Sequence, residues 1–391
     1  MNSPLSDARF DHELLSNYHF DVVRWDAQVK AVQAGRATGQ ESFVTGRVEP
    51  APDIPALGYD GNAEEAEACE VGVGALRRGE VAALVLNGGL ATRFGGAVKG
   101  IVEVFDGKSF LALKAEDVKL AAAQYGAAVP LVMLNSFSTS GATKEHFDQC
   151  GYFGLEPADV LFMDQTVSVR LDINGEPFFG QDGAPRYYAP GHGEFFDVLL
   201  TSGVRARLIA RGIKWLTFSN VDNLGATVDP TIVGKHILSQ ADMTVEVIEK
   251  RRNAQGQFDV GGSPVLHDGR LVVVEGFRFP PELSQDRLRD FQTNNMIFSL
   301  SALDSPMDLP RYLVKKTVDA RPSLAFEAIS CEASGKQRAD GSMALSLGLL
   351  RVAREGVHGR FFPVKSREDL AAQRDVLRAR LDQGWALRTR A

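Results

Sequence analysis

The sequence contains very few cysteines and no long apolar run. Its 391 residues include three cysteines, at positions 69, 150 and 331, far apart and without a CxxC pair. This excludes a disulfide scaffold and a cysteine zinc cluster, and it is typical of a reducing cytoplasm. No stretch approaches the roughly 18 apolar residues of a membrane-spanning helix, and the acidic start MNSPLSDARFDHE does not resemble a signal peptide. We therefore expect a soluble, cytoplasmic protein with no membrane partner.

A surplus of positive charge is also missing. The 43 Lys and Arg stand against 50 Asp and Glu, a formal net charge of −7. Nucleic-acid binding needs a basic footprint, so we expect no nucleic-acid partner. A phosphorylated small molecule stays compatible, because a pocket needs only a few well-placed cations. Residues 351–391 alone hold ten Lys and Arg against five Asp and Glu, which indicates either a solvated basic helix or cations that face an anionic substrate.

The sequence does contain short apolar runs that end in polar residues. These runs are residues 81–86, 129–134, 160–163 and 215–218. Helix-like stretches over 111–125 and 142–149 separate them, and this alternation predicts an α/β fold with a mainly parallel sheet. Ligands bind outside the carboxyl ends of the strands in such sheets, so the polar residues that follow the runs are candidate site positions.

The flanking regions have other patterns. Residues 11–33 have apolar residues at helical spacing, and a further helix is predicted over 63–76. Residues 48–62 carry three prolines and two glycines and are typical of a linker. Alternating residues within 244–248, 271–277 and 295–300 predict an antiparallel extension of the sheet.

The glycine-rich segment LNGGLATRFGGAVKG, residues 86–100, is the most informative part of the chain. Its glycines at 88, 89, 95 and 96 let backbone N–H groups approach a phosphate closely. Arg93 and Lys99 supply cations suited to the charge of a phosphoryl group. The glycine spacing does not give GxGxxG, so this is no dinucleotide fingerprint. Gly107-Lys108-Ser109 resembles the end of a P-loop, but Val102 stands where its first glycine belongs.

This loop resembles the GGxGTRxG…PK signature of sugar-nucleotide pyrophosphorylases. Its Leu-Asn-Gly-Gly opening is most similar to the eukaryotic-type UTP–glucose-1-phosphate uridylyltransferase family. Five further segments resemble motifs of that family in the same order: VPLVMLNSFSTSGATK from Val129, YAPGHGEFFDVLLTSG from Tyr188, FSNVDNLGATVDP from Phe218, FQTNNMIFSL from Phe291 and RFFPVKSREDL from Arg360. The resemblance extends over about residues 81–370.

The resemblance implies a Rossmann-like nucleotidyltransferase fold, in which helices flank a mixed, mostly parallel sheet and a helical region precedes it. It divides the chain into an N-terminal helical arm and linker (1–62), a nucleotidyltransferase catalytic domain (63–340) and a short C-terminal segment with a catalytic lysine and a closing helix (341–391). Only 26 residues follow Lys365, so we expect no β-helical C-terminal domain of the eukaryotic kind. We accordingly expect a monomer or a weak dimer.

The reaction implied by the resemblance joins UTP and a sugar 1-phosphate, with glucose 1-phosphate preferred, into a UDP-sugar and pyrophosphate, with Mg²⁺ as the cofactor. The attacking phosphate oxygen is already ionised, so the protein must neutralise charge and hold two anions in line. Two alternatives stay open: a pyrophosphorylase of broad specificity or one for UDP-N-acetylhexosamine, and a non-catalytic protein that binds sugar nucleotides. No single side chain identifies the hexose.

The resemblance also assigns roles to individual residues. The catalytic residues are Lys365, Arg93 and Lys99, and the metal ligand is Asp222, which a strand end would present to Mg²⁺ and phosphate oxygens. The nucleotide-binding residues are Leu86, Asn87, Gly88, Gly89, Gln165, Gly191 and Asn220. The sugar-binding residues are His192, Gly261, Glu275, Asn294 and Asn295. The amide of Gln165 offers one donor and one acceptor to the edge of uracil.

Three positions depart from the family pattern. Ala91 stands where the family has glycine, and Val98 stands where proline precedes the lysine of the loop. The residues after Gln165 read Thr-Val-Ser-Val-Arg, without the proline that precedes this arginine in the family.

Overall fold

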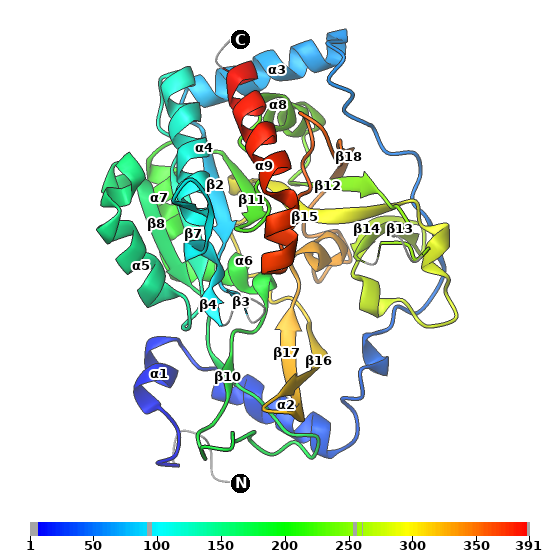
Figure 1. Cartoon of the computed structure of the whole chain (residues 1–391). Coiled ribbons are helices and arrows are strands. Elements are labelled where there is room, and N and C mark those ends of the chain that lie inside the picture. The colour runs from blue at the N-terminus through cyan, green and yellow to red at the C-terminus, as the bar shows by residue number, and fades with distance from the viewer. Residues whose placement is uncertain (1–6, 92–95, 253–255, 260, 389–391) are drawn as a thin grey trace.

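A seven-stranded sheet forms the centre of the protein in a computed structural model that describes residues 7–91, 96–252, 256–259 and 261–388 (Figure 1). The strands lie in the order β18-β12-β15-β11-β2-β7-β8. Their bounds are Val81–Leu86 (β2), Leu131–Asn135 (β7), Val160–Asp164 (β8), Trp215–Asn220 (β11), Met243–Glu249 (β12), Asp290–Ser299 (β15) and Leu347–Arg351 (β18). All neighbours are parallel except the two pairs that β15 makes. The predicted mixed, mostly parallel sheet is thereby confirmed.

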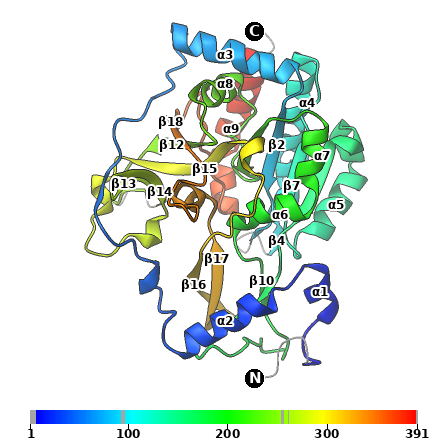
Figure 2. The ribbon, with the colours of Figure 1, turned by 180° about the vertical axis from the view of Figure 1, so that it is seen from behind.

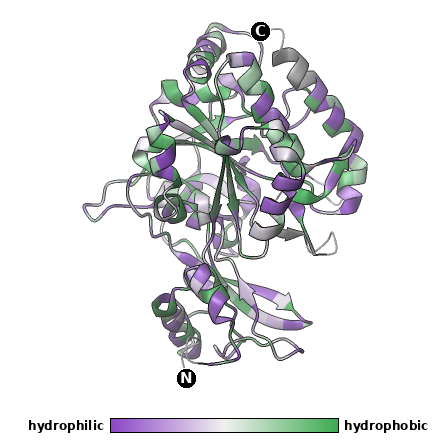
Figure 3. Cartoon of the chain, turned by 90° about the vertical axis from the view of Figure 1, so that its left-hand side faces the viewer, coloured by the Kyte–Doolittle hydropathy of each residue, from purple (hydrophilic) through white to green (hydrophobic). Residues whose placement is uncertain are grey.

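Helices cover both faces of this sheet, because successive residues of a buried strand point to opposite sides. Ala83 and Val85 of β2 face a core under α3, α4, α8 and α9, whereas Ala82 and Leu84 face a core under α6 and α7. The helices span Ala63–Arg77 (α3), Phe110–Tyr125 (α4), Ser140–Gln149 (α5), Phe195–Thr201 (α6), Val204–Ala210 (α7), Pro230–Ser239 (α8) and Arg367–Arg388 (α9). In Figure 3 the strands are mostly green, the apolar colour, while the helices alternate between green and purple.

Local sequence signals explain where the helices begin and end. The side chains of Asn62, Ser109 and Asp229 accept backbone N–H bonds at the starts of α3, α4 and α8. Gly126 ends α4 with a φ of 77°, in the left-handed region that glycine adopts without strain. The helices expected over 63–76 and 111–125 are therefore present with nearly the predicted limits.

A second, smaller lobe lies below the carboxyl edge of the sheet (Figures 1 and 2). It contains α1 (His12–Asn17), α2 (Val22–Gln33), β9 (Ser168–Val169), β10 (Tyr187–Tyr188), β16 (Arg311–Val318) and β17 (Arg321–Ala328). One apolar cluster holds these elements together, and the indole Nε1 of Trp25 donates to the Val169 carbonyl at 3.0 Å. We call this part the N-terminal lobe. The helix expected over 11–33 is in fact two helices, separated near His19, which has a φ of 51°.

The antiparallel extension differs in part from the expectation. β15 runs against the other strands of the central sheet, and β12 pairs with it in the expected antiparallel sense, whereas β12 is parallel to β18 on its other side. The pattern over 271–277 belongs to another sheet, in which β13 (Ser263–His267) lies between β14 (Arg270–Val274) and β1 (Val48–Pro50). The predicted linker thus begins with a strand. Short hairpins pair β3 (Leu90–Ala91) with β4 (Ala97–Val98) and β5 (Glu103–Phe105) with β6 (Lys108–Ser109).

Among the helices of the described residues, none has the length and apolar composition that crossing a membrane requires.

Candidate active site

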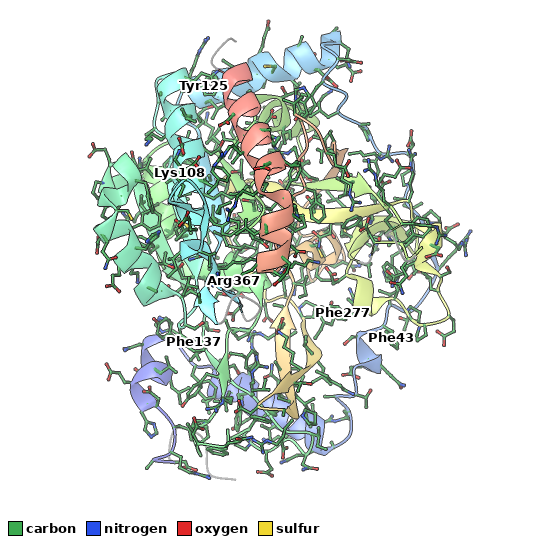
Figure 4. All side chains as sticks on the ribbon, in the orientation of Figure 1. Phe43, Lys108, Tyr125, Phe137, Phe277 and Arg367 are labelled. Atoms are coloured by element: carbon green, nitrogen blue, oxygen red, sulfur yellow. The ribbon has the colours of Figure 1, made fainter. Side chains whose placement is uncertain are left out.

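A cavity of about 880 Å³ lies between the carboxyl ends of the parallel strands and the N-terminal lobe. Four strand ends meet there because β11, β2, β7 and β8 are consecutive and in register, with Asn220 opposite Leu86 and Asn135 opposite Asp164. Phe137, labelled in Figure 4, lies at the junction and contacts the rings of Tyr18 and Tyr187 from the lobe. The cavity therefore has one wall from the sheet and one from the lobe.

Most of the predicted site residues line this cavity. They are Leu86, Gly88, Gly89, Lys99, Gln165, Gly191, His192, Asn220, Asp222 and Lys365. Asn87, Gly261, Glu275, Asn294 and Asn295 are not among its lining residues. Arg93 lies outside the described residues.

Two glycines are required because side chains and backbone pack directly against them. A Cβ at position 88 would lie 2.1 Å from Oε1 of Gln165. Gln165 is itself buried, and its Nε2 donates to the carbonyl of Gly191 at 2.7 Å. Gly191 has a φ of 89°, and a Cβ there would lie 2.3 Å from the carbonyl oxygen of Ala328. The glycine loop, Gln165 and the Gly191 segment therefore form one closely packed surface.

Asn87 supports this loop from below. It is 1 % exposed, and its Nδ2 donates to Oδ1 of Asn135 at 2.9 Å and to Oγ1 of Thr143 at 2.7 Å. The amide nitrogen of Asn87 thus has partners inside the protein, its Oδ1 has none in the described part of the chain, and the nucleotide contact expected of this residue stays a prediction.

Asp222 lies at the end of β11 and pairs with a lysine of the loop. Its Oδ2 is 2.5 Å from Nζ of Lys99, and the two side chains are 14 % and 18 % exposed. Among the described residues, no group of three or more His, Cys, Asp or Glu side chains could hold a metal ion. Mg²⁺ commonly binds through one or two carboxylates together with substrate phosphates, and a single carboxylate facing an anion cavity fits that donor set.

Lys365 reaches the cavity from the start of α9. The Oγ of Ser366 accepts from the backbone N–H of Asp369 at 3.1 Å, and the carboxylate of Asp369 accepts from the N–H of Lys365 at 2.9 Å. Ser366 thus caps the helix, and the Asp369 carboxylate binds the N–H of the residue before the cap, so both bonds stabilise the first turn. The sequence places Lys365 immediately before that turn, so its backbone position is well determined.

Asn223 ties the segment before Lys365 to the end of β11. Its Oδ1 accepts from the N–H of Phe362 at 2.9 Å, and its Nδ2 donates to the carbonyl of Arg360 at 3.0 Å. Asp222 and Lys365, far apart in the sequence, are therefore held at one site by the residue that follows Asp222.

A buried ion pair lies beneath this junction. The guanidinium of Arg360 makes two bonds of 2.7 Å to the carboxylate of Glu246, and both side chains are at most 5 % exposed. Burial lowers the pKa of Arg360, but Glu246, with smaller contributions from Tyr59 and Asp229, raises it, and the net shift is upward. Asn295 belongs to the same network, since its Nδ2 donates to Glu246 and its Oδ1 accepts from Asn223. The side chain of Asn295 is hydrogen-bonded inside the protein, and the sugar contact expected of it stays a prediction.

A chain of hydrogen bonds joins two cavity residues, Asn220 and His192. Asn294 has a φ of 61°, at a bulge where β15 loses register with β12. Its Nδ2 donates to Oδ1 of Asn220 at 2.9 Å, and its Oδ1 accepts from Oγ of Ser330 at 3.3 Å. Ser330 in turn contacts Nδ1 of His192 at 2.8 Å. Asn294 therefore acts behind the cavity, on the residues that line it.

His192 presents a neutral imidazole to the cavity. Burial lowers its pKa, although Glu275 and Glu327 act in the opposite direction. The hydroxyl of Ser330 lies 2.8 Å from Nδ1 and its backbone N–H lies 3.3 Å from the same atom, so Ser330 fixes the orientation of the imidazole through Nδ1.

Gly261 and Glu275 lie near one another beside Phe291 and Gln292 of β15. A Cβ at Gly276 would lie 3.0 Å from the carbonyl oxygen of Gly261, and Glu275 accepts from Nε2 of Gln292 at 3.2 Å. The structure brings these two predicted sugar residues near one another but does not place them at the cavity wall.

The lobe supplies cavity residues that the sequence patterns did not identify. Arg170 stands over the ring of Tyr188 at 5.2 Å, and burial lowers its pKa. Its Nη1 is buried and has no hydrogen-bond partner in the described part of the chain. Lys316 and Glu327, both at the cavity, pair at 2.5 Å. Of these three residues, only Arg170 could have been found from the sequence, because it lies five residues after Gln165. Lys316 and Glu327 come from a hairpin that is distant in the sequence.

The described wall carries more positive than negative charge. The lining residues include the cations Lys99, Arg170, Lys316 and Lys365, against the carboxylates of Asp222 and Glu327. A cavity of this size with a cationic excess at the ends of parallel strands suits a phosphorylated ligand.

Comparison with known proteins identifies the family. A sequence model described as UTP–glucose-1-phosphate uridylyltransferase matches residues 62–382. The chain belongs to the UTP–glucose-1-phosphate uridylyltransferase family. The predicted resemblance is thereby confirmed, and the match extends well beyond the glycine loop.

Individual relatives agree with this. The chain is 30 % identical over 311 residues to a probable UTP–glucose-1-phosphate uridylyltransferase of Schizosaccharomyces pombe, covering 74 % of this chain and 58 % of that protein. It is 30 % identical over 323 residues to the UTP–glucose-1-phosphate uridylyltransferase of Solanum tuberosum, covering 79 % and 64 %. The chain thus matches about three-fifths of the length of these curated relatives.

Solved structures of the same kind share its fold. A UDP-glucose phosphorylase of Trypanosoma brucei superposes with a TM-score of 0.70 at 24 % identity, over 90 % of this chain and 74 % of that one. The UDP-N-acetylglucosamine pyrophosphorylase of Trypanosoma brucei, in complex with an inhibitor, gives 0.69 at 21 %, over 96 % and 82 %. The predicted nucleotidyltransferase fold is confirmed.

Proposed function

We propose that this protein transfers the uridylyl group of UTP to a sugar 1-phosphate, preferably glucose 1-phosphate, and releases pyrophosphate. The observation that carries the proposal is the convergence of Lys99, Asp222 and Lys365 on one cavity with Gln165 and His192. These residues come from the glycine loop, the ends of β11 and β8, the turn before α6 and the start of α9. Family membership and the names of the relatives support the same reaction.

In this reaction an oxygen of the sugar phosphate attacks the α-phosphorus of UTP, and the bond from that phosphorus to the β-phosphate oxygen breaks. Two anions must approach each other, so catalysis depends on charge neutralisation and alignment. We assign Lys365 to the phosphates of both substrates and Lys99 to the triphosphate. Lys99 now pairs with Asp222, so a phosphate entering the cavity competes for this ammonium group.

The proposed Mg²⁺ would be held by Asp222 and by phosphate oxygens, and when bound it would supply further positive charge between the two substrates. The chain's own part is to present one carboxylate at the end of β11. We keep Mg²⁺ as a proposal on the basis of this donor set.

The remaining cavity residues fit recognition of the base and the sugar phosphate. The amide of Gln165 rests against Gly88 and Gly191, which leaves little freedom for its orientation toward uracil. His192 offers a neutral imidazole and is not needed as a base, because the attacking phosphate is already ionised.

The test is an assay of the purified chain with UTP, Mg²⁺ and a panel of sugar 1-phosphates, with pyrophosphate release as the readout. We expect release with glucose 1-phosphate. Faster release with N-acetylglucosamine 1-phosphate would favour the UDP-N-acetylhexosamine alternative, and comparable rates with several sugars would favour broad specificity. No release with any sugar would sink the proposal and favour a non-catalytic binding protein.

Lys365→Ala gives a sharper test of mechanism. We expect turnover to fall much more than UTP binding, because the lysine is assigned to charge that develops during transfer. Equal losses in turnover and UTP affinity would contradict that assignment.

The cytoplasmic location and the monomeric or weakly dimeric state stay predictions. Light scattering on the purified chain would test the second, and a stable octamer would contradict it.

A further inference from the structure

One buried lysine has no part in the reaction described above. Lys114 lies in α4, whose two ends are close to Lys108 and Tyr125 in Figure 4, and it is 5 % exposed. An ammonium group is costly to take out of water unless its donors are paired. A methionine or leucine would fill such a place at lower cost, so the charge requires an explanation beyond packing.

All the partners of Lys114 belong to a single turn. Its Nζ donates to Oγ of Ser219 at 3.1 Å, to the carbonyl of Asn223 at 2.8 Å and to the carbonyl of Ala226 at 2.9 Å. The three donors of an ammonium group are therefore all used. The bonded residues begin at the end of β11 and enclose residue 222, which carries the carboxylate at the cavity.

The same helix fastens the next part of the turn as well. The Oδ2 of Asp117 accepts from the backbone N–H of Val228 at 2.8 Å, and Asp117 is 5 % exposed. On the opposite side Asn223 binds the segment that leads to Lys365. The turn over 219–228 is thus held by α4 from below, and it holds the approach to Lys365 in return.

We propose that Lys114 is a positioning residue, which fixes the carboxylate of Asp222 in the cavity by binding three points of the turn that carries it. The inference rests on the proposed function, since Asp222 matters as a ligand of the cation that accompanies UTP. Lys114 touches neither substrate. It acts through backbone carbonyls at 223 and 226, so that the turn keeps one conformation when the Lys99–Asp222 pair opens.

The test compares three variants for binding of Mn²⁺, a spectroscopic substitute for Mg²⁺, to the protein with UTP. Lys114→Met keeps the volume and removes all three bonds. Ser219→Ala removes one acceptor and leaves Lys114 in place. His236→Leu is the matched control, because His236 is also fully buried and bonded to two side chains, Thr244 and Ser299, but lies outside the cavity.

We expect Lys114→Met to raise the dissociation constant for Mn²⁺, measured by electron paramagnetic resonance, about tenfold, and to lower kcat by a similar factor. The KM for UTP should change less than threefold, because Gln165 and the glycine loop are untouched. Ser219→Ala should shift the Mn²⁺ constant in the same direction by about two- to threefold. His236→Leu should lower the melting temperature and leave the Mn²⁺ constant unchanged.

The proposal is overturned if Lys114→Met lowers the melting temperature like His236→Leu and leaves the Mn²⁺ constant unchanged. If Lys114→Met does not fold, Ser219→Ala decides, and an unchanged Mn²⁺ constant in that variant overturns the proposal too. Failure of the proposed function is recognised separately, because the unaltered chain would then release no pyrophosphate with any sugar 1-phosphate. The Mn²⁺ measurements need no turnover and still report on Lys114.

Discussion

Gly88→Ala should damage base recognition by displacing one side chain. The added Cβ would lie 2.1 Å from Oε1 and 3.3 Å from Cδ of Gln165, and 3.6 Å from the carbonyl carbon of Asn135. Contacts near 2 Å between nonbonded atoms do not occur, so something must move. The side chain of Gln165 is the movable partner, and when it moves it loses the 2.7 Å bond from Nε2 to the carbonyl of Gly191.

The size of the effect follows from the contacts that the displaced amide no longer makes to the base, because the bond to Gly191 is lost in the free protein as well as in the complex. A buried donor or acceptor of the base left without its partner costs about 1–3 kcal/mol. The affinity for UTP should therefore fall by about 10- to 100-fold, at roughly 1.4 kcal/mol per factor of ten. The preference for UTP over CTP should fall with it, because that preference is assigned to the oriented amide of Gln165.

A double-mutant cycle provides the decisive assay, with UTP and CTP affinities measured by titration calorimetry. Gln165→Ala removes the atoms that the methyl group introduced by Gly88→Ala would strike, so the double variant should match Gln165→Ala alone. If the two effects instead add, Gly88→Ala acts by another route and the steric reasoning is refuted. Retention of full UTP preference in Gly88→Ala would refute it as well.

Three further predictions concern stability and substrate binding. Burial lowers the pKa of His236 from 6.5 to about 4. The unfolded chain therefore takes up a proton at a higher pH than the folded one, and the free energy of unfolding decreases as the pH falls from 6.5 toward 4. The loss is at most roughly 3 kcal/mol, and denaturant titrations of His236→Gln should show a shallower pH dependence over that range. Arg360→Met should lower the free energy of unfolding by about 3–5 kcal/mol, because it leaves the carboxylate of Glu246 unpaired. Adding Glu246→Leu to the same chain should recover part of this free energy in urea denaturation. No recovery would contradict the pairing. Arg170→Met should weaken UTP binding about tenfold in calorimetry, through loss of one charge-assisted donor, whereas unchanged affinity would show that this guanidinium serves only the lobe.

The sequence predicted best what depends on neighbouring residues. The sequence contains short apolar runs that are followed by Asn87, Ser136, Gln165 and Asn220. These runs predicted parallel strands with a site at their carboxyl ends, and the structure has the strands and a cavity at those ends. The helices expected over 63–76 and 111–125 are present for the same reason, because helical periodicity is a pattern among near neighbours. Such patterns can be recognised in the sequence because the interactions behind them involve residues close together in the chain.

What the sequence did not predict depends on distant contacts. The lobe wall with Lys316 and Glu327 needs a hairpin to meet residues more than a hundred positions earlier in the chain. Asn294 and Asn295 are adjacent and identical in type, but because of the bulge Asn294 donates a hydrogen bond to Asn220 and Asn295 donates one to Glu246. Lys114 lies in an ordinary helical pattern, and only its three bonds to another segment distinguish it.

The N-terminal lobe has a consequence for how the protein is made. Leu15, Trp25, Val29 and Val32 complete a core whose other half, around Leu324 and Phe326, is synthesised almost 300 residues later. At about 5–20 residues per second, these apolar side chains wait some 15–60 s for their partners. These helices are therefore buried long after they are synthesised, and the cavity wall that they support is completed only after residues 311–328 have been made.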